Sequence, residues 1–273
     1  IAAALIPVHG WQSIFLAGLV ITLSMIPIVF FALPESLDFL SNSRPKQALE
    51  TMNRTLQRMG LSRLEQFEPH KPGNIAKASV RSLLTERHRA PTLFLWLAFF
   101  MCFFTLYFLL SWIPKILVEA GFSMEQGIDA GIAFNAGAIL GVLALGYLAD
   151  KKGIRELIAI FLIIGGAFMI GFGLAPTEII ILIMLSFLIG SFVDGGFAGL
   201  YAVAARLYPT EIRTTGVGWA IGAGRFGGVA GPYVGGLVVA AGWPLIWSFG
   251  LFAIPLIIGA IAVMAIKPEK LAL

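Results

Sequence analysis

Long apolar segments alternate with shorter polar ones along most of the chain. Seven apolar segments are long enough to cross a hydrocarbon layer of roughly 30 Å, which takes about 20 residues of helix. They cover residues 13–33, 91–118, 128–148, 154–175, 179–207, 216–241 and 245–266. The pattern predicts an all-α, polytopic membrane protein.

The polar segment at residues 34–90 is the one long break in this pattern. Within it, the stretch SRPKQALETMNRTLQRMGL has the apolar spacing of a short amphipathic helix that lies on a membrane surface or over the mouth of the membrane-spanning part. We interpret the segment as a solvated linker between two helical parts, in preference to a regulatory or enzymatic domain.

Lys and Arg residues are unevenly distributed among the predicted loops. Most of the nineteen lie between Arg44 and Arg89, and others follow the third, fifth and seventh spans, whereas the alternate loops hold almost none. Because basic residues collect in cytoplasmic loops, the alternation supports the segmentation and predicts a cytoplasmic linker and C-terminus. Arg225 is the one basic residue well inside a predicted span.

The composition agrees with a membrane environment. The chain is 58% hydrophobic and 12% charged, whereas soluble domains carry about 25% charged residues. The expected partner is therefore a lipid bilayer, the plasma (inner) membrane. The net charge of +4 sits in short loops beside apolar helices, so we interpret it as a determinant of topology and expect no nucleic-acid partner.

Residues suited to enzymatic chemistry are sparse. The three histidines fall in predicted loops, no His/Glu pair has metal-ligand spacing, and no serine stands in a G-x-S-x-G elbow. Gly222, Gly224 and Gly227 have the spacing of a dinucleotide-binding loop, but no strand precedes them and no carboxylate follows about 20 positions later. We expect neither an enzyme nor a metal or cofactor site.

The glycines of this region suit helix packing in lipid. The pattern G-x-x-x-G-P-x-x-G-G comprises Gly227, Gly231, Pro232, Gly235 and Gly236. Small residues on one face of a membrane helix allow close backbone approach, and the proline ring permits a bend because it removes one backbone hydrogen bond. The pattern predicts a packing and hinge surface.

Several motifs resemble those of major facilitator superfamily transporters. GYLADKKGIR, at residues 146–155, is similar to the family signature G-x-L-[AS]-D-[RK]-x-G-[RK]-[RK]. The matching positions are Gly146, Leu148, Asp150, Lys151, Gly153 and Arg155, and Ile154 departs from the pattern. The segments LPESLDFL, TLYFLLSWIPKILVEAGFS and LYPTEIRTTGVGWAIGAGRFGGVAGPYVGG resemble the aromatic acid:proton symporter branch.

The resemblance implies twelve helices in two pseudo-symmetric halves that rock about a central site. Residues 1–12 would then be the end of helix 5 and an outer loop, 13–33 helix 6, 34–90 the central linker, and 91–273 the C-terminal six-helix bundle with a short cytoplasmic tail. We expect a missing N-terminal half upstream. The glycine-rich residues 131–146 occupy the second place in their three-helix group, as residues 216–241 do in theirs.

Ionisable groups inside a membrane cost about 2.5–3.5 kcal/mol on insertion scales and therefore indicate function. Asp194 is the candidate for proton coupling; alternatively, it is a hydrogen-bonded carboxylate of the outer vestibule. Arg225 presents a planar fork suited to a carboxylate substrate. Its alternative role is a salt bridge to Asp194, or to an acidic residue of the missing half, that stabilises one access state.

Four further side chains are candidates for binding a flat acid. Tyr201 lies seven positions after Asp194 and therefore on a similar helix face. Tyr107, Trp112 and Asn135 offer aromatic stacking and an amide group. The alternative for these positions is contact with lipid or ordinary helix packing.

A second group of charges lies at the predicted cytoplasmic loops. Asp150, Lys151 and Arg155, with Glu211 and Arg213 in the next such loop, have the charges needed for a network that locks one access state. The alternative is a set of solvated loop charges.

The resulting hypothesis is proton-coupled uptake of a small aromatic carboxylate such as a hydroxybenzoate, driven by the proton gradient without a cofactor. The expected ligands are a small anionic aromatic substrate and a proton. Two alternatives stay open: a sugar or other organic-anion porter of the same superfamily, and a truncated, non-transporting half that acts as a partner protein.

Overall fold

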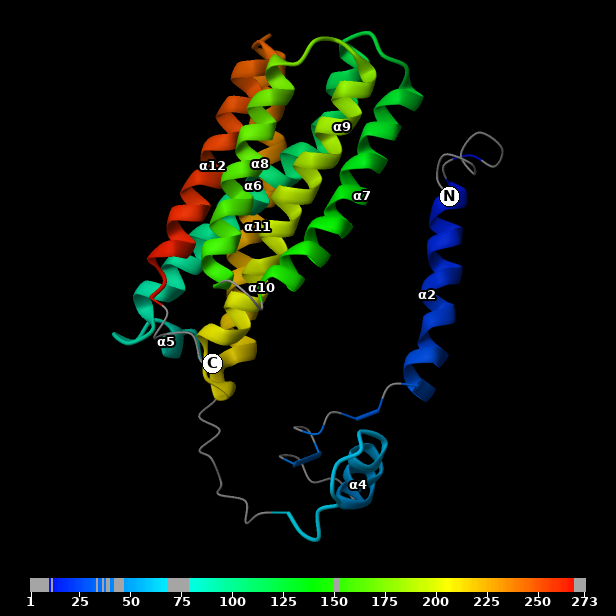
Figure 1. Cartoon of the computed structure of the whole chain (residues 1–273), viewed down its shortest axis with the longest axis vertical. Helices are drawn as coiled ribbons and strands as arrows, with labels where there is room; N and C mark the ends of the chain where they lie inside the picture. The colour runs from blue at the N-terminus through cyan, green and yellow to red at the C-terminus, as the bar shows by residue number, and fades with distance from the viewer. Residues whose placement is uncertain are drawn as a thin grey trace. The chain divides into compact units, whose positions relative to one another are not determined.

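The computed structural model describes residues 10, 12–32, 34–35, 37, 40–41, 47–67, 79–149 and 153–267, apart from the side chains of residues 210 and 211. The chain divides into two compact units, residues 1–75 and 76–273 (Figure 1). Throughout the described ranges the regular elements are helices, which confirms the predicted all-α class.

The first unit contains an apolar helix and a short amphipathic one. Helix α2 (Gln12–Ala32) has no buried residue, and its length and hydropathy suit a membrane crossing. Helix α4 (Ala48–Arg58) buries one face. Its small core consists of Leu40, Ala48, Met52 and Leu56, with Leu37 and Phe67 packed against them.

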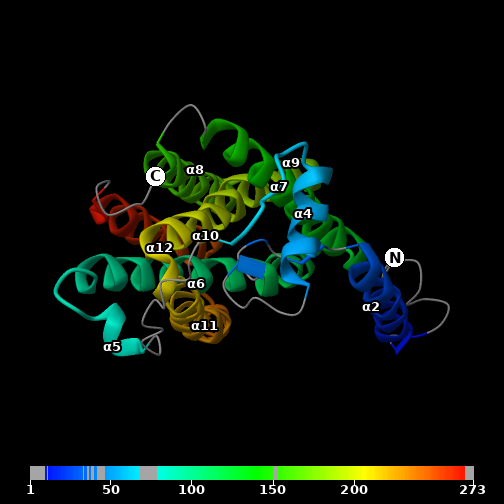
Figure 2. The ribbon, with the colours of Figure 1, turned by 90° about the horizontal axis from the view of Figure 1, so that it is seen from below.

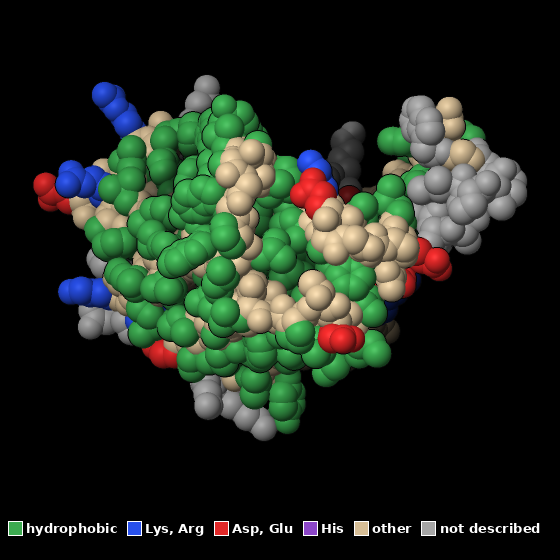
Figure 3. Space-filling view, turned by 90° about the horizontal axis from the view of Figure 1, so that it is seen from above, with side chains coloured by type: hydrophobic (Ala, Val, Ile, Leu, Met, Phe, Trp, Pro, Cys, Tyr) green, Lys and Arg blue, Asp and Glu red, His purple; other side chains and the backbone are tan. Residues whose placement is uncertain are grey.

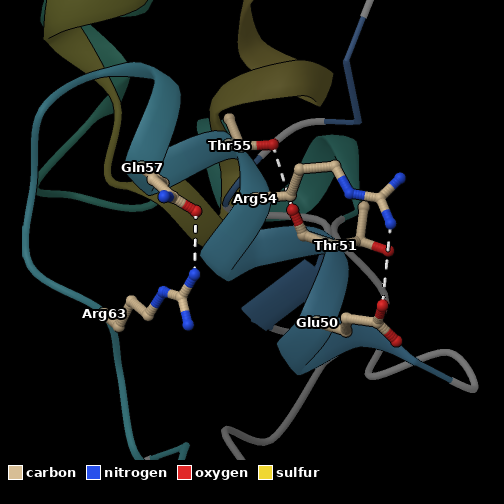
Figure 4. Close-up of polar contacts among 6 residues, drawn as sticks. All are labelled: Glu50, Thr51, Arg54, Thr55, Gln57 and Arg63. Atoms are coloured by element: carbon tan, nitrogen blue, oxygen red, sulfur yellow. Dashed lines mark hydrogen bonds and ion pairs between the residues drawn. The ribbon is translucent and has the colours of Figure 1, made fainter.

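The opposite face of α4 carries polar contacts (Figure 4). Arg54 lies 3.6 Å from the Glu50 carboxylate, and Arg63 donates to the Gln57 side chain at 2.9 Å. Asn53 fastens the following loop, because its amide and carbonyl groups bond both backbone polar groups of Leu64. The predicted amphipathic helix is therefore confirmed.

The second unit is a helical bundle (Figures 1 and 2). Its elements are α5 (Val80–Leu83), α6 (Arg89–Glu119), α7 (Met124–Ala149), α8 (Ile154–Leu174), α9 (Ile179–Ile189), the π-helix η1 (Gly190–Asp194), α10 (Gly195–Leu207), α11 (Thr210–Ala240) and α12 (Leu245–Ala265). Elements α9, η1 and α10 follow one another without a loop and occupy the predicted span 179–207. Helix α5 lies within the predicted linker, but its Leu83 belongs to the core of the bundle.

Six helices of the described chain are long and apolar enough to cross a membrane, counting α9 to α10 as one. The predicted span 216–241 falls in α11, which is not among the six, because its many glycines and two arginines lower its hydropathy. It is nevertheless a 31-residue helix packed along α6. Many large apolar side chains of these helices are exposed, as lipid contact requires, and apolar side chains also cover much of the end of the molecule that Figure 3 draws.

Aromatic rings and one hydroxyl join α6 to α12. The rings of Phe108 and Phe252 stack with centroids 3.6 Å apart, and Phe104 lies 5.2 Å from Phe252. Thr105, which is fully buried, donates its hydroxyl hydrogen to the Phe252 carbonyl at 2.7 Å. This bond satisfies a polar group that would otherwise be costly in an apolar core.

Glycines bring α11 against the backbone of α6. A Cβ atom at Gly227 would collide with the Phe100 carbonyl oxygen, and one at Gly231 would collide with the Phe104 carbonyl oxygen. Helices this close gain extensive van der Waals contact, which is a main source of association in lipid. In the structure this stretch packs closely on α6, and the predicted hinge role of Pro232 stays a prediction.

The same construction recurs between α7 and the α9–η1 segment. A Cβ atom at Gly137 would collide with the Phe187 carbonyl oxygen, and one at Gly141 with the Ser191 carbonyl oxygen. Both second helices of the predicted three-helix groups therefore use glycines to pack on the first helix of the other group, as an inverted repeat requires.

We predict that Gly227→Ala and Gly231→Ala each destabilise the bundle, because the new methyl group forces α11 away from α6. Overpacking of this kind costs roughly 1–3 kcal/mol. The matched controls are Gly218→Ala and Gly222→Ala on the same helix, where a Cβ atom meets nothing within 4 Å. Thermal unfolding in detergent measures the effect, and equal melting temperatures for all four variants would contradict the packing account.

Candidate substrate site

Arg225 of α11 is exposed and is held by two groups of α6. Its Nη1 donates to the Tyr107 hydroxyl at 2.6 Å, and its guanidinium carbon lies 5.3 Å from the centre of the Phe103 ring. Within the described part of the chain, no ion pair joins Arg225 to Asp194 or to another carboxylate. The guanidinium is thus oriented and retains donors for an added anion.

Asp194, the last residue of η1, is half-buried and lines a groove with Asn135 of α7. The groove has a volume of about 370 Å³, and its other lining residues are Ala138, Ile139, Val142 and Leu143. Asn135 also lines an adjoining open groove next to Pro114. Its amide nitrogen donates to the Gly131 carbonyl of its own helix at 2.8 Å.

Tyr201 of α10 neighbours both groups of residues. It is close enough to Arg225, Tyr107 and Asp194 to interact electrostatically with each of them. Its ring, which is 37% exposed, contacts Phe99 and Phe197 edge to face at centroid distances of 5.2 and 5.4 Å.

A cluster of aromatic rings packs against these polar residues. The Phe103 ring lies 5.6 Å from Tyr107 and 4.7 Å from Phe197. The first pair is tilted and the second is edge to face, and aromatic rings at such distances hold one another in place. The structure therefore brings together Arg225 and three further predicted site residues, Tyr107, Tyr201 and Asp194, with Asn135 beside Asp194.

Trp112 is placed differently from the other candidates. Its indole N–H donates to the Pro232 carbonyl at 3.1 Å, and its ring faces Gly235 and Gly236 of α11. The Lys115 ammonium lies 4.4 Å from the ring centre. These contacts make Trp112 a link between α6 and α11, and a role in substrate binding stays a prediction.

The structure describes only some residues of the predicted charge network. Asp150 and Lys151 lie outside the described residues, as does the Glu211 side chain. Arg155, at the start of α8, is buried and donates to the Met264 carbonyl of α12 at 3.0 Å. Its Nε and Nη1 atoms have no partner among the described residues.

The remaining residues of the predicted gate lie near the ends of helices. Gly146 lies in the last turn of α7, and Gly153 directly precedes α8. Arg213, in the second turn of α11, donates to the Tyr208 carbonyl at 3.3 Å. Whether these groups form a gate stays a prediction.

Sequence reasoning missed a buried hydrogen-bonded chain beside this region. The Tyr208 hydroxyl donates to Thr92 at 3.1 Å, and Thr92 donates to the Leu83 carbonyl at 3.1 Å. Burial raises the pKa of the Tyr208 phenol, while the bond to Thr92 acts in the opposite direction. The only available signal was a tyrosine directly after an apolar span.

Among the described residues, no three His, Cys, Asp or Glu side chains come together as metal ligands would. The candidate site is instead a polar face of one arginine, one aspartate, one amide and two phenols over an aromatic cluster. Such a face can bind an organic anion by charge, hydrogen bonds and stacking.

Comparison with known proteins identifies the family. The family model described as Major Facilitator Superfamily matches residues 1–180 and 146–272. The chain therefore belongs to the major facilitator superfamily, a family of membrane transporters and not of enzymes. It is an integral, multi-pass membrane protein.

The chain is similar to several curated transporters. It is 34% identical to the gallate transporter of Pseudomonas putida over 97% of this chain and 59% of that protein. It is 30% identical to the 4-hydroxybenzoate transporter PcaK of Pseudomonas aeruginosa over 89% of this chain and 55% of that protein. A benzoate transport protein of Acinetobacter baylyi is 27% identical over 99% of this chain. The chain spans a little over half the length of these relatives.

We predict that Trp112→Phe lowers the melting temperature but leaves the KM for transport unchanged. The substitution keeps a ring against α11 but removes the hydrogen bond to Pro232, which is worth about 1 kcal/mol, and part of the ring contact with Gly236. Thermal unfolding and uptake kinetics on the complete transporter measure both effects. A raised KM with an unchanged melting temperature would place Trp112 in the substrate site instead.

Proposed function

We propose that the chain is the C-terminal part of a secondary transporter that takes up a small aromatic carboxylate, such as a hydroxybenzoate, together with a proton. The names of the relatives support this substrate class: gallate, 4-hydroxybenzoate and benzoate are all aromatic carboxylates. Alternating access about a central site is the mechanism expected of the superfamily.

The observation that carries the proposal is that Arg225 has no carboxylate partner among the described residues. A guanidinium in a membrane helix is costly unless it is paired or hydrated, and among the described residues no carboxylate pairs with it. A substrate carboxylate supplies the missing charge through two parallel hydrogen bonds. Tyr107 holds the fork in place and so reduces the entropy lost on binding.

The rings next to Arg225 suit the aromatic part of the substrate. Phe103 lies under the guanidinium, and Tyr201 exposes part of its ring on the same face. Offset or edge-to-face contact between rings adds about 0.5–1.5 kcal/mol to simple burial. Arg225 then selects the charge, and the rings select a flat aromatic body.

Asp194 is the proposed proton carrier. It is half-buried at a groove and lies in the π-turn η1, a type of turn that is frequent at functional sites. Protonation of a membrane carboxylate removes its charge and so eases the movement of the helices around it. The energy source is the proton gradient, and no cofactor is needed.

A second half completes the proposed transporter. The six-helix bundle supplies one wall of the central cavity, and an N-terminal half supplies the other. The greater length of the relatives supports this arrangement. By the charge rule, the linker and the C-terminus lie on the cytoplasmic side of the plasma (inner) membrane.

Uptake of labelled 4-hydroxybenzoate by cells that express the complete transporter tests the proposal. We expect a protonophore to abolish uptake, benzoates to compete and hexoses not to compete. Arg225→Gln should reduce uptake at least tenfold, because it removes the charge that pairs with the substrate. Arg206→Gln, which removes an exposed charge from α10, is the matched control. Competition by hexoses, or uptake insensitive to the protonophore, would contradict the proposal.

The proposed gate has a separate test. Asp150→Asn should reduce the transport rate while substrate affinity stays within about twofold, because a gate acts on the change between access states. Counterflow rates and equilibrium binding on the same preparation measure the two quantities. Equal loss of both, or no loss of either, would rule out a gate at Asp150.

A further inference from the structure

The two helix crossings that are packed through glycines have the same spacing of contacts. Gly137 and Gly141 are four residues apart and face carbonyl oxygens of Phe187 and Ser191, which are also four residues apart. Gly227 and Gly231 face the carbonyl oxygens of Phe100 and Phe104 with the same spacing. The crossing of α7 on α9–η1 is therefore equivalent to the crossing of α11 on α6.

The polar residues of the site lie at matching positions relative to the two helix crossings. Asn135 and Arg225 each lie two residues before the first glycine of their crossing. Asp194 and Tyr107 each lie three residues after the second carbonyl that faces a glycine. By their offsets from the two crossings, Asp194 and Asn135 therefore correspond to Tyr107 and Arg225.

The two pairs have opposite chemistry. Arg225 and Tyr107 are hydrogen-bonded to each other and present a cationic donor. Asp194 and Asn135 line one groove and present a carboxylate and an amide, which accept hydrogen bonds. Tyr201 is close enough to Asp194, Arg225 and Tyr107 to interact electrostatically with each, so it neighbours both pairs.

We propose that Asp194 and Asn135 form a subsite for the ring hydroxyl of the substrate and select hydroxylated aromatic acids over unsubstituted ones. The inference rests on the proposed function, in which Arg225 and Tyr107 hold the carboxylate. A hydroxybenzoate carries an anion at one end and a hydrogen-bond donor at the other, which matches the polarity of the two pairs. The groove, at about 370 Å³, falls within the roughly 300–1,000 Å³ of small-molecule sites.

The subsite is compatible with proton coupling at the same residue. A carboxyl group has two oxygens, so one can carry the proton while the other accepts the bond from the ring hydroxyl. Selection follows because an acid without the hydroxyl leaves the half-buried carboxyl group of Asp194 without that hydrogen-bond partner. The hydroxyl therefore contributes to affinity only where Asp194 and Asn135 are both present.

Equilibrium binding to the purified complete transporter tests the subsite without requiring turnover. Dissociation constants for 4-hydroxybenzoate and benzoate are measured by titration calorimetry for the wild-type protein, Asp194→Leu and Asn135→Leu. We expect the wild-type protein to prefer 4-hydroxybenzoate. Asp194→Leu should weaken its binding roughly tenfold or more, the scale of a hydrogen bond to a charged group, and Asn135→Leu roughly threefold to tenfold, the scale of a bond to a neutral amide; both should leave benzoate within about twofold.

Two further variants complete the comparison. Asp129→Leu removes an exposed carboxylate of α7 and should leave both affinities unchanged. Arg225→Leu should weaken both acids equally, because both carry the carboxylate. Asn135 is exposed, so its variant keeps the test valid even where Asp194→Leu does not fold.

The outcomes separate the two proposals. A wild-type protein without preference for the hydroxylated acid, or variants that weaken both acids equally, would overturn the subsite and leave the aromatic-acid function standing. A wild-type protein that binds neither acid would overturn the proposed function and the subsite with it.

Discussion

Close backbone contact at glycines is the interaction on which the rest of the bundle depends. In lipid the separated helices are already surrounded by hydrocarbon, so burial of apolar side chains gives little net association. Contact between Gly227 and Phe100, and between Gly137 and Phe187, replaces that driving force with dense van der Waals packing. It also fixes the rotation of α7 and α11 about their axes, which decides where their polar side chains lie.

That rotation connects packing with chemistry. Because Gly227 faces α6, Arg225 two residues earlier lies on the exposed face, where the Tyr107 hydroxyl accepts its hydrogen bond. Because Gly137 faces α9, Asn135 lies beside Asp194 in one groove. The stripes of small residues and the polar residues beside them are therefore two parts of one arrangement.

Much of this fold could be predicted from the sequence, because a membrane helix must satisfy its backbone internally and present apolar side chains. The spans follow from that constraint. The spacing of apolar residues indicates the amphipathic helix α4, and the spacing of small residues indicates the close packing at Gly231. The ends of helices were less predictable: α11 begins at Thr210, before the apolar stretch, because hydropathy does not register a polar first turn. The π-turn at Asp194 has no signal in local composition.

The site was predictable as a set of residues but not as a set of contacts. Arg225 and Asp194 stand out in the sequence because charged side chains are rare in membrane helices. The sequence does not show that Arg225 bonds to Tyr107 or that Asp194 shares a groove with Asn135. Trp112 shows the limit most clearly. An aromatic residue in a membrane helix suits stacking on a substrate, but its N–H bonds the Pro232 carbonyl, a partner 120 positions away.

The most direct test of the claim that this polar face binds the substrate is a cryo-electron microscopy structure of the complete transporter with 4-hydroxybenzoate. The account predicts ligand density between the two polar pairs, with the carboxylate on Arg225 and Tyr107 and the ring hydroxyl toward Asp194 and Asn135. Ligand density elsewhere in the protein, without contact to Arg225, would contradict it.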